Sequence, residues 1–181
     1  SDELLGMTLY LDIREFVRTK GRQEYSNARL TIRFDDNDSI TEDIKIKARG
    51  IMRLDYCNFP PIMLKFKGND NGNERVVRKG SIKLVTHCFQ SPVYESYVLK
   101  EYLAYHLFNL VTPYSFKTRL VRISYVDSIR PKNSHTTYGF LIENDDAMAE
   151  RNHAMVIKNP KLTQNHMVAE DMARVAVFNY M

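Results

Sequence analysis

A chain of 181 residues with 44% hydrophobic and 27% charged residues can bury one sizeable core, and this composition excludes a largely disordered protein. Its net charge of +4 comes from basic residues scattered along the sequence, which argues against a dedicated nucleic-acid binder. No stretch approaches the ~18 consecutive apolar residues that a membrane-spanning helix needs.

The first third of the chain alternates apolar and polar residues, which is typical of half-buried strands. The charged stretch 14–27 is predicted to be a loop. Asp35–Ser39 predicts a hairpin turn, since the glycine and the distal glutamate of a calcium loop are missing. Gly68–Asn73 predicts a surface loop, because its glycine spacing fits neither the Walker loop nor GxGxxG. The strands expected here span 7–13, 28–34, 42–49 and 62–67.

The longest helical pattern runs from Ser91 to Thr112. Ser91 can cap this helix, and Pro113 ends it by displacing the preceding residue from helical backbone angles. Nearly all of its residues are apolar or aromatic, so most of its circumference is expected to be covered. Glu101 falls within the aromatic stripe, where a carboxylate is costly unless it is paired. The sequence therefore predicts a specific partner for Glu101.

The remaining pattern completes an α+β fold. We expect an antiparallel sheet packed on the long central helix, resembling a protein-kinase small lobe with the first helices of the large lobe. Three parts are predicted: a β-rich extension over 1–40, a kinase-like small lobe over 41–143, and the start of a large lobe over 144–181. The elements expected after residue 79 are strands at 80–88, 116–127 and 136–143, the central helix, a short helix at 145–152, and a longer helix from about 164.

This order of elements suggests nucleotide-binding chemistry. In kinases, a strand lysine contacts the phosphates and a glutamate on the next helix orients it. Lys83 precedes the central helix, so a Lys83–Glu101 pair is one hypothesis. Alternatively, Lys83 is simply solvated, and Glu101 bonds an arginine such as Arg119 or Arg122, or a tyrosine hydroxyl. Glu143 lies where a kinase places its adenine-binding hinge, or it stabilises the following helix N-terminus.

Several segments together resemble the CotH-like proteins, atypical kinases named for a spore-coat protein. They are Arg49-Gly50 followed by Lys65-Phe66-Lys67, the strand Leu84-Val85-Thr86-His87, and the strand end Leu141-Ile142-Glu143. The resemblance covers roughly residues 42–181. It implies ATP and Mg²⁺ as cofactors, a protein Ser/Thr substrate, and Lys83, Glu101 and Glu143 as nucleotide-binding residues. It also favours an extracytoplasmic or cell-surface location.

The same resemblance implies that catalysis needs residues outside this chain. In the family, the catalytic and metal-binding aspartates follow the helix that ends here in ARVAVFNYM. We therefore expect a fragment without catalytic or metal-binding residues of its own, and without phosphotransfer. The alternative is a non-catalytic structural or binding domain of an exported protein. A carbohydrate-associated module ranks last, because no paired carboxylates suit glycoside hydrolysis. Cys57 and Cys88 are expected to be buried thiols or a disulfide, and a metal site is least expected, since only His87 lies near enough in sequence to help.

Overall fold

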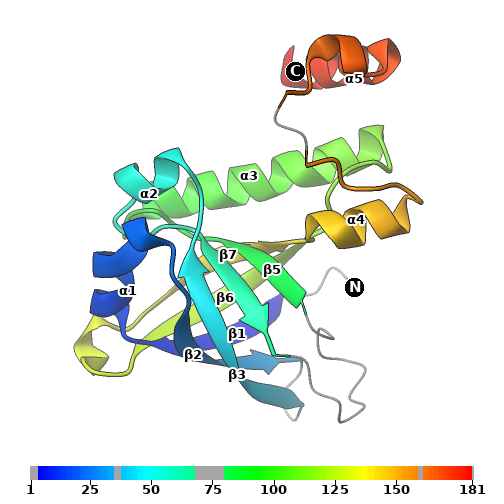
Figure 1. Ribbon diagram of the computed structural model, residues 1–181. Helices are drawn as coiled ribbons and strands as arrows, with labels where there is room; N and C mark the ends of the chain where they lie inside the picture. The colour runs from blue at the N-terminus through cyan, green and yellow to red at the C-terminus, as the bar shows by residue number, and fades with distance from the viewer. Residues whose placement is uncertain (1–3, 35–37, 68–79, 159–160, 181) are drawn as a thin grey trace.

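The strands form one closed barrel in the computed structural model, which describes residues 4–34, 38–67, 80–158 and 161–180. Around the barrel, the order of the strands is β1-β2-β3-β4-β5-β7-β6. The strands within these ranges are β1 (Leu5–Leu11), β2 (Ser26–Arg33), β3 (Ser39–Ala48), β4 (Ile62–Phe66), β5 (Gly80–Val85), β6 (Thr118–Asp127) and β7 (His135–Ile142) (Figure 1).

A parallel pair closes the barrel. β1 pairs antiparallel with β2 on one side and parallel with β6 on the other, from Leu5 opposite Val121 to Leu11 opposite Asp127. All the other pairs are antiparallel. Since each strand has two hydrogen-bonded neighbours, the described strands leave no sheet edge open to another chain.

The described ranges contain five helices, all outside the barrel. They are α1 (Ile13–Thr19), α2 (Met52–Tyr56), α3 (Pro92–Val111), α4 (Asp145–Arg151) and α5 (Ala169–Tyr180), with short 3₁₀ turns at η1 (Lys20–Arg22), η2 (Pro131–Asn133) and η3 (Gln164–His166). α3 starts and ends where the sequence predicts, because Ser91 accepts a bond from the Val93 amide and Thr112 precedes Pro113. No described helix is long and apolar enough to cross a membrane, which agrees with the prediction of no membrane span.

The main core fills the inside of the barrel. Alternate residues of each strand point inward, and the fully buried ones are mostly branched aliphatic side chains that pack well on pleated strands. They include Leu9, Leu30, Ile44, Ile46, Ile62, Leu64, Leu84, Val121 and Ile123. A second, smaller cluster lies outside the barrel, where Val98 of α3 packs on Val85, Phe140 and Ile142.

The predicted fold class, an antiparallel sheet packed on a central helix like a kinase small lobe, is wrong. The strands enclose their own core, and α3 lies against the outside of the barrel along β7 and β6 (Figure 1). Only Val98 of α3 is buried, whereas Leu103, Leu107 and Leu110 are at least half exposed. The expectation that most of this helix is covered is therefore also wrong.

Two short helices, α1 and α2, were not predicted from the sequence. α1 overlaps the predicted loop 14–27, and it begins where the Asp12 side chain accepts a hydrogen bond from the Glu15 amide; Phe16 of this helix is buried. α2 follows Gly50, whose φ of 109° favours glycine. A disulfide joins Cys57 after α2 to Cys88 after β5, which settles the two alternatives for the cysteines. The predicted loop Gly68–Asn73 lies outside the described residues.

Candidate functional site

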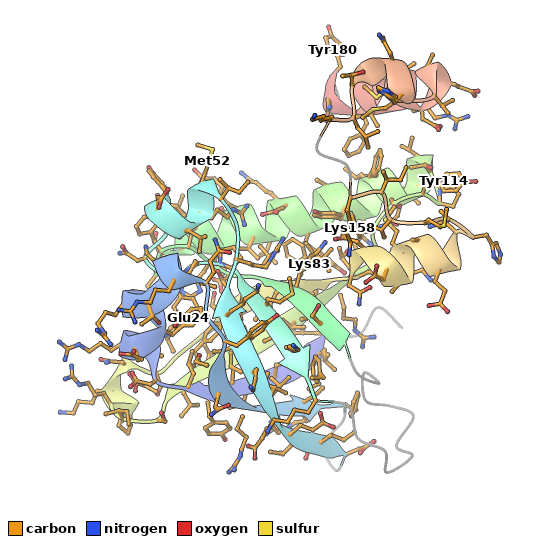
Figure 2. The ribbon with its side chains drawn as sticks, viewed as in Figure 1. Glu24, Met52, Lys83, Tyr114, Lys158 and Tyr180 are labelled. Carbon is orange, nitrogen blue, oxygen red and sulfur yellow. A yellow bond between two sulfur atoms is a disulfide. The ribbon has the colours of Figure 1, made fainter. Side chains whose placement is uncertain are left out.

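Lys83 lies on the outer face of the barrel, beneath α4. As the strand pattern predicts, Leu84 points into the core, while Lys83 and Val85 point outward. The Lys83 ammonium lies 2.5 Å from an Asp145 carboxylate oxygen and 4.7 Å from the centre of the Phe116 ring. Only 15% of the side chain is exposed. Figure 2 shows Lys83 between the strands and the helices above them.

Glu101 binds a different cation from the predicted one. Its carboxylate accepts a 2.7 Å hydrogen bond from the guanidinium of Arg53 on α2. The Lys83–Glu101 pair is not formed, because each residue has another partner within the described structure. The prediction of an arginine partner was correct in kind, but α2, which supplies that arginine, had no recognised signal in the sequence.

Arg49 brings a third cation to the same place. It follows β3 and is half-buried among Tyr105, Arg53, Asp145 and Glu101. Burial lowers the pKa of Arg49, and Arg53 adds to this, while Tyr105, Asp145 and Glu101 act in the opposite direction. The guanidinium makes no side-chain hydrogen bond within the described part of the chain. We name Arg49, Arg53 and Lys83, with Glu101 and Asp145, the cationic cluster, since it holds three cations and two carboxylates.

Glu143 has a structural role in this fold. Its carboxylate accepts hydrogen bonds from the Lys117 amide at 3.0 Å and from Arg151 at 2.9 and 3.2 Å. Burial raises the pKa of Glu143, but the bonds from Arg151 and Lys117 outweigh it and lower the pKa overall. The Glu143 amide is also bonded, to the Lys117 carbonyl, so it is not free to meet an adenine base. The helix after it is capped by Asn144.

A row of lysines extends the positive charge across the outside of the barrel. Lys45 of β3 lies directly opposite Lys65 of β4, and these like charges repel. The ammonium groups of Lys47 and Lys65 lie 4.9 and 5.0 Å from the centre of the Tyr25 ring. Tyr25, Lys45 and Lys65 line a groove of about 830 Å³ that reaches Asn144, Asp146 and Glu150 beside α4. The alternation of lysine with apolar residues at 45–47 and 65–67 could have identified this lysine row from the sequence.

The residues near Lys83 suit phosphate groups better than they suit a metal ion alone. Guanidinium and ammonium groups are the side chains that most often bind phosphate oxygens. Within the described ranges, no three His, Cys, Asp or Glu side chains are placed to hold a metal ion. Asp145 and Glu101 are nevertheless the type of carboxylate that shares Mg²⁺ with nucleotide phosphates. An ATP phosphate chain with its Mg²⁺ is thus chemically compatible with the cationic cluster.

Comparison with protein-family models, with curated proteins and with solved structures finds no match to this chain.

Proposed function

We propose that this domain binds a phosphate-bearing ligand, a nucleotide, at the cationic cluster. The observation that carries the proposal is Arg49, a half-buried guanidinium that has no side-chain hydrogen bond among the described residues and lies in the same cluster as Lys83. The half-buried guanidinium of Arg49 bonds no side-chain acceptor among the described residues, and a phosphate oxygen would supply one. Four residues of the cluster come from α2, β5, α3 and α4, and Arg49 directly follows β3, so the folded barrel brings them together.

The resemblance to CotH-like kinases supports ATP as the nucleotide and remains a prediction. Arg49 and Lys83 would hold the phosphates, and Asp145 would share the bound Mg²⁺. ATP supplies the transferable phosphoryl group, whereas this chain contributes binding and orientation. Phosphorylation of a protein Ser or Thr would further require the catalytic and metal-binding aspartates that the resemblance implies.

Thermal unfolding in the presence of ligand tests the proposal. Mg²⁺-ATP at 100 times its Kd should raise the stability by about 2.7 kcal/mol, which is several degrees in Tm for a domain of this size. Arg49→Ala and Lys83→Ala should each remove most of that shift. Lys132→Ala in η2 is the matched control, because it removes an exposed lysine at the opposite end of β7 from α4 and Asp145. Equal shifts in all four proteins would refute the site.

The second candidate function is a non-catalytic binding domain of an exported protein, and the disulfide favours it. Cys57–Cys88 is a bond typical of extracytoplasmic proteins, since cytosolic thiols are usually kept reduced. One measurement distinguishes the two candidates. Phosphotransfer from radiolabelled ATP supports the kinase prediction, whereas nucleotide binding without transfer supports the binding domain.

A further inference from the structure

A groove with a strongly positive lining lies between α1 and the connection from β6 to β7. Its volume is about 690 Å³, and its lining includes Arg14 and Arg18 of α1 and Arg130 and Lys132 of the connection. No Asp or Glu is among the described residues that line it. Figure 1 shows α1 and the yellow-green connection at the end of the barrel away from α4. We name this site the basic groove.

The cations of the basic groove repel one another. Arg14 and Arg18 are four positions apart on α1, where like charges destabilise a helix. Arg18 is paired with Glu15 at 2.6 Å, but Arg14, Arg130 and Lys132 are exposed and form no ion pair within the described structure. An anionic partner would relieve this repulsion, and charge complementarity of this kind selects partners and speeds their association.

A buried carboxylate fixes one wall of the basic groove. Asp127 is only 1% exposed, and one of its oxygens accepts hydrogen bonds from the Ile129 and Arg130 amides, both at 2.9 Å. The other oxygen accepts a bond from the Asn133 side-chain amide at 3.2 Å. The charge of Asp127 also acts on the nearby Arg130 side chain, but these hydrogen bonds already occupy the carboxylate. The connection is therefore held in shape before a partner arrives, which lowers the entropic cost of binding.

The other wall offers an apolar contact between the charges. Ile13 and Val17 of α1 line the basic groove and are only partly buried, although they also pack on the main core. They are four positions apart, so they share one face of the helix and lie beside Arg14 and Arg18. An aliphatic side chain of a partner can pack on them while its acidic neighbours meet the arginines.

An acidic peptide fits this lining better than a nucleic acid or a membrane surface. Single-stranded nucleic acids are bound by stacking on aromatic side chains, and no Phe, Tyr or Trp is among the described lining residues. A flat lipid surface would meet the exposed cations but would contact the partly buried Ile13 and Val17 poorly. We propose that the basic groove binds an acidic peptide segment of a partner protein, with one aliphatic side chain packed on Ile13 and Val17. This proposal is independent of nucleotide binding.

Fluorescence anisotropy with a labelled peptide tests the site. The probe is leucine flanked by two glutamates on each side, and glycine in place of the leucine should weaken binding roughly 5-fold, because the aliphatic contact is lost. The double variant Arg14→Gln with Arg130→Gln should weaken binding about 10-fold, since two exposed charge pairs are lost. Arg33→Gln with Arg122→Gln is the matched control, because it removes the same charge from exposed arginines of β2 and β6 outside the groove. It should bind the peptide like the unsubstituted protein.

NMR of the unsubstituted protein provides the second measurement, and it needs no variant to fold. The peptide should shift the backbone amide resonances of α1 and of residues 128–134 and leave those of α4 in place. Absence of peptide binding, equal weakening in both double variants, or shifts spread over the whole barrel would overturn the proposal.

Sedimentation with phosphatidylserine vesicles covers the membrane alternative. The protein should stay in the supernatant under conditions in which it binds the peptide. Vesicle binding that the Arg14→Gln, Arg130→Gln variant loses, without peptide binding by the unsubstituted protein, would make a lipid surface the partner and overturn the proposal.

Discussion

Glu143 connects three segments of the molecule through a single carboxylate. It bonds Arg151 of α4 and the Lys117 amide before β6, and Arg151 in turn donates to the carbonyls of Pro113 and Ser115. Only 14% of the Glu143 side chain is exposed, so these charge-assisted bonds are weakly screened. The hydrogen bonds of Glu143 and Arg151 therefore hold α4, and with it Asp145, beside Lys83.

Replacing Glu143 with glutamine should destabilise the fold and change its pH dependence. Loss of the charged hydrogen bonds costs about 1.5–3 kcal/mol at pH 7. Because the pKa of Glu143 is lowered in the folded protein, its contribution is complete above the unfolded value of 4.5 and disappears as pH falls through the folded value. Urea unfolding from pH 7 to pH 3 should therefore show a flatter pH slope for Glu143→Gln. Glu150→Gln, on the exposed side of α4, should keep the original slope.

At the scale of elements, α3 is attached to the barrel by a narrow face. Val98 packs on Val85, Phe140 and Ile142, with Tyr102 and Tyr105 beside them. The leucines at 103, 107 and 110 point away from this contact and are exposed. Near its C-terminal end, Phe108 contacts Phe178 of α5, with ring centres 4.7 Å apart. Apolar composition alone therefore gives little information about which side of this helix is buried.

Substitutions on the two faces of α3 should lower the stability by unequal amounts. Val98→Ala removes buried methyl groups and should lower the free energy of unfolding by about 1–3 kcal/mol. The triple change Leu103→Gln, Leu107→Gln and Leu110→Gln should alter it by less than about 1 kcal/mol, since glutamine is a good helix former and these side chains are exposed. Chemical denaturation measures both. A large loss in the triple variant would mean that these leucines are buried in solution.

Local sequence patterns allowed most single strands and helices to be predicted. The contacts between residues far apart in the sequence could not be predicted in this way. Alternation located the strands, and the serine–proline signals located α3. α1 was missed because Arg14, Glu15 and Arg18 make its sequence look like a charged loop, although Glu15 and Arg18 form an ion pair on the helix. Lys83 was placed on the correct face, but its partner Asp145 is 62 positions away and has no local signature. The parallel β1–β6 pair, which decides the fold class, had no local sequence signature either.

At the scale of the whole molecule, β1 is the strand that turns a sheet into a barrel. It contributes four buried side chains, Leu5, Met7, Leu9 and Leu11, and it covers the edges of both β2 and β6. α5, in contrast, has no buried residue among those described. The two ends of the chain therefore have very different importance for the stability of the barrel.

Truncation at each end should show this difference. A chain starting at Asp12 should fail to fold, because four lost apolar side chains at about 1.5–3 kcal/mol each approach the entire stability of a typical domain. A chain ending at Lys158 should keep a cooperative thermal transition and the same far-UV signal from the barrel. Circular dichroism compares the two. Cooperative unfolding of the first truncation would contradict an essential role for β1.

The closing pair also fixes when this protein can finish folding during its synthesis. Leu5 and its partner Val121 are 116 positions apart. At ~5–20 residues per second on the ribosome, β1 waits roughly 6–23 seconds for β6 to be made. Through that interval the apolar face of β1 has no second neighbour, and contacts of such long sequence separation form slowly. The nascent chain must therefore be shielded from aggregation until β6 emerges. The bond between Cys57, which follows α2, and Cys88, which follows β5, can form before the barrel closes.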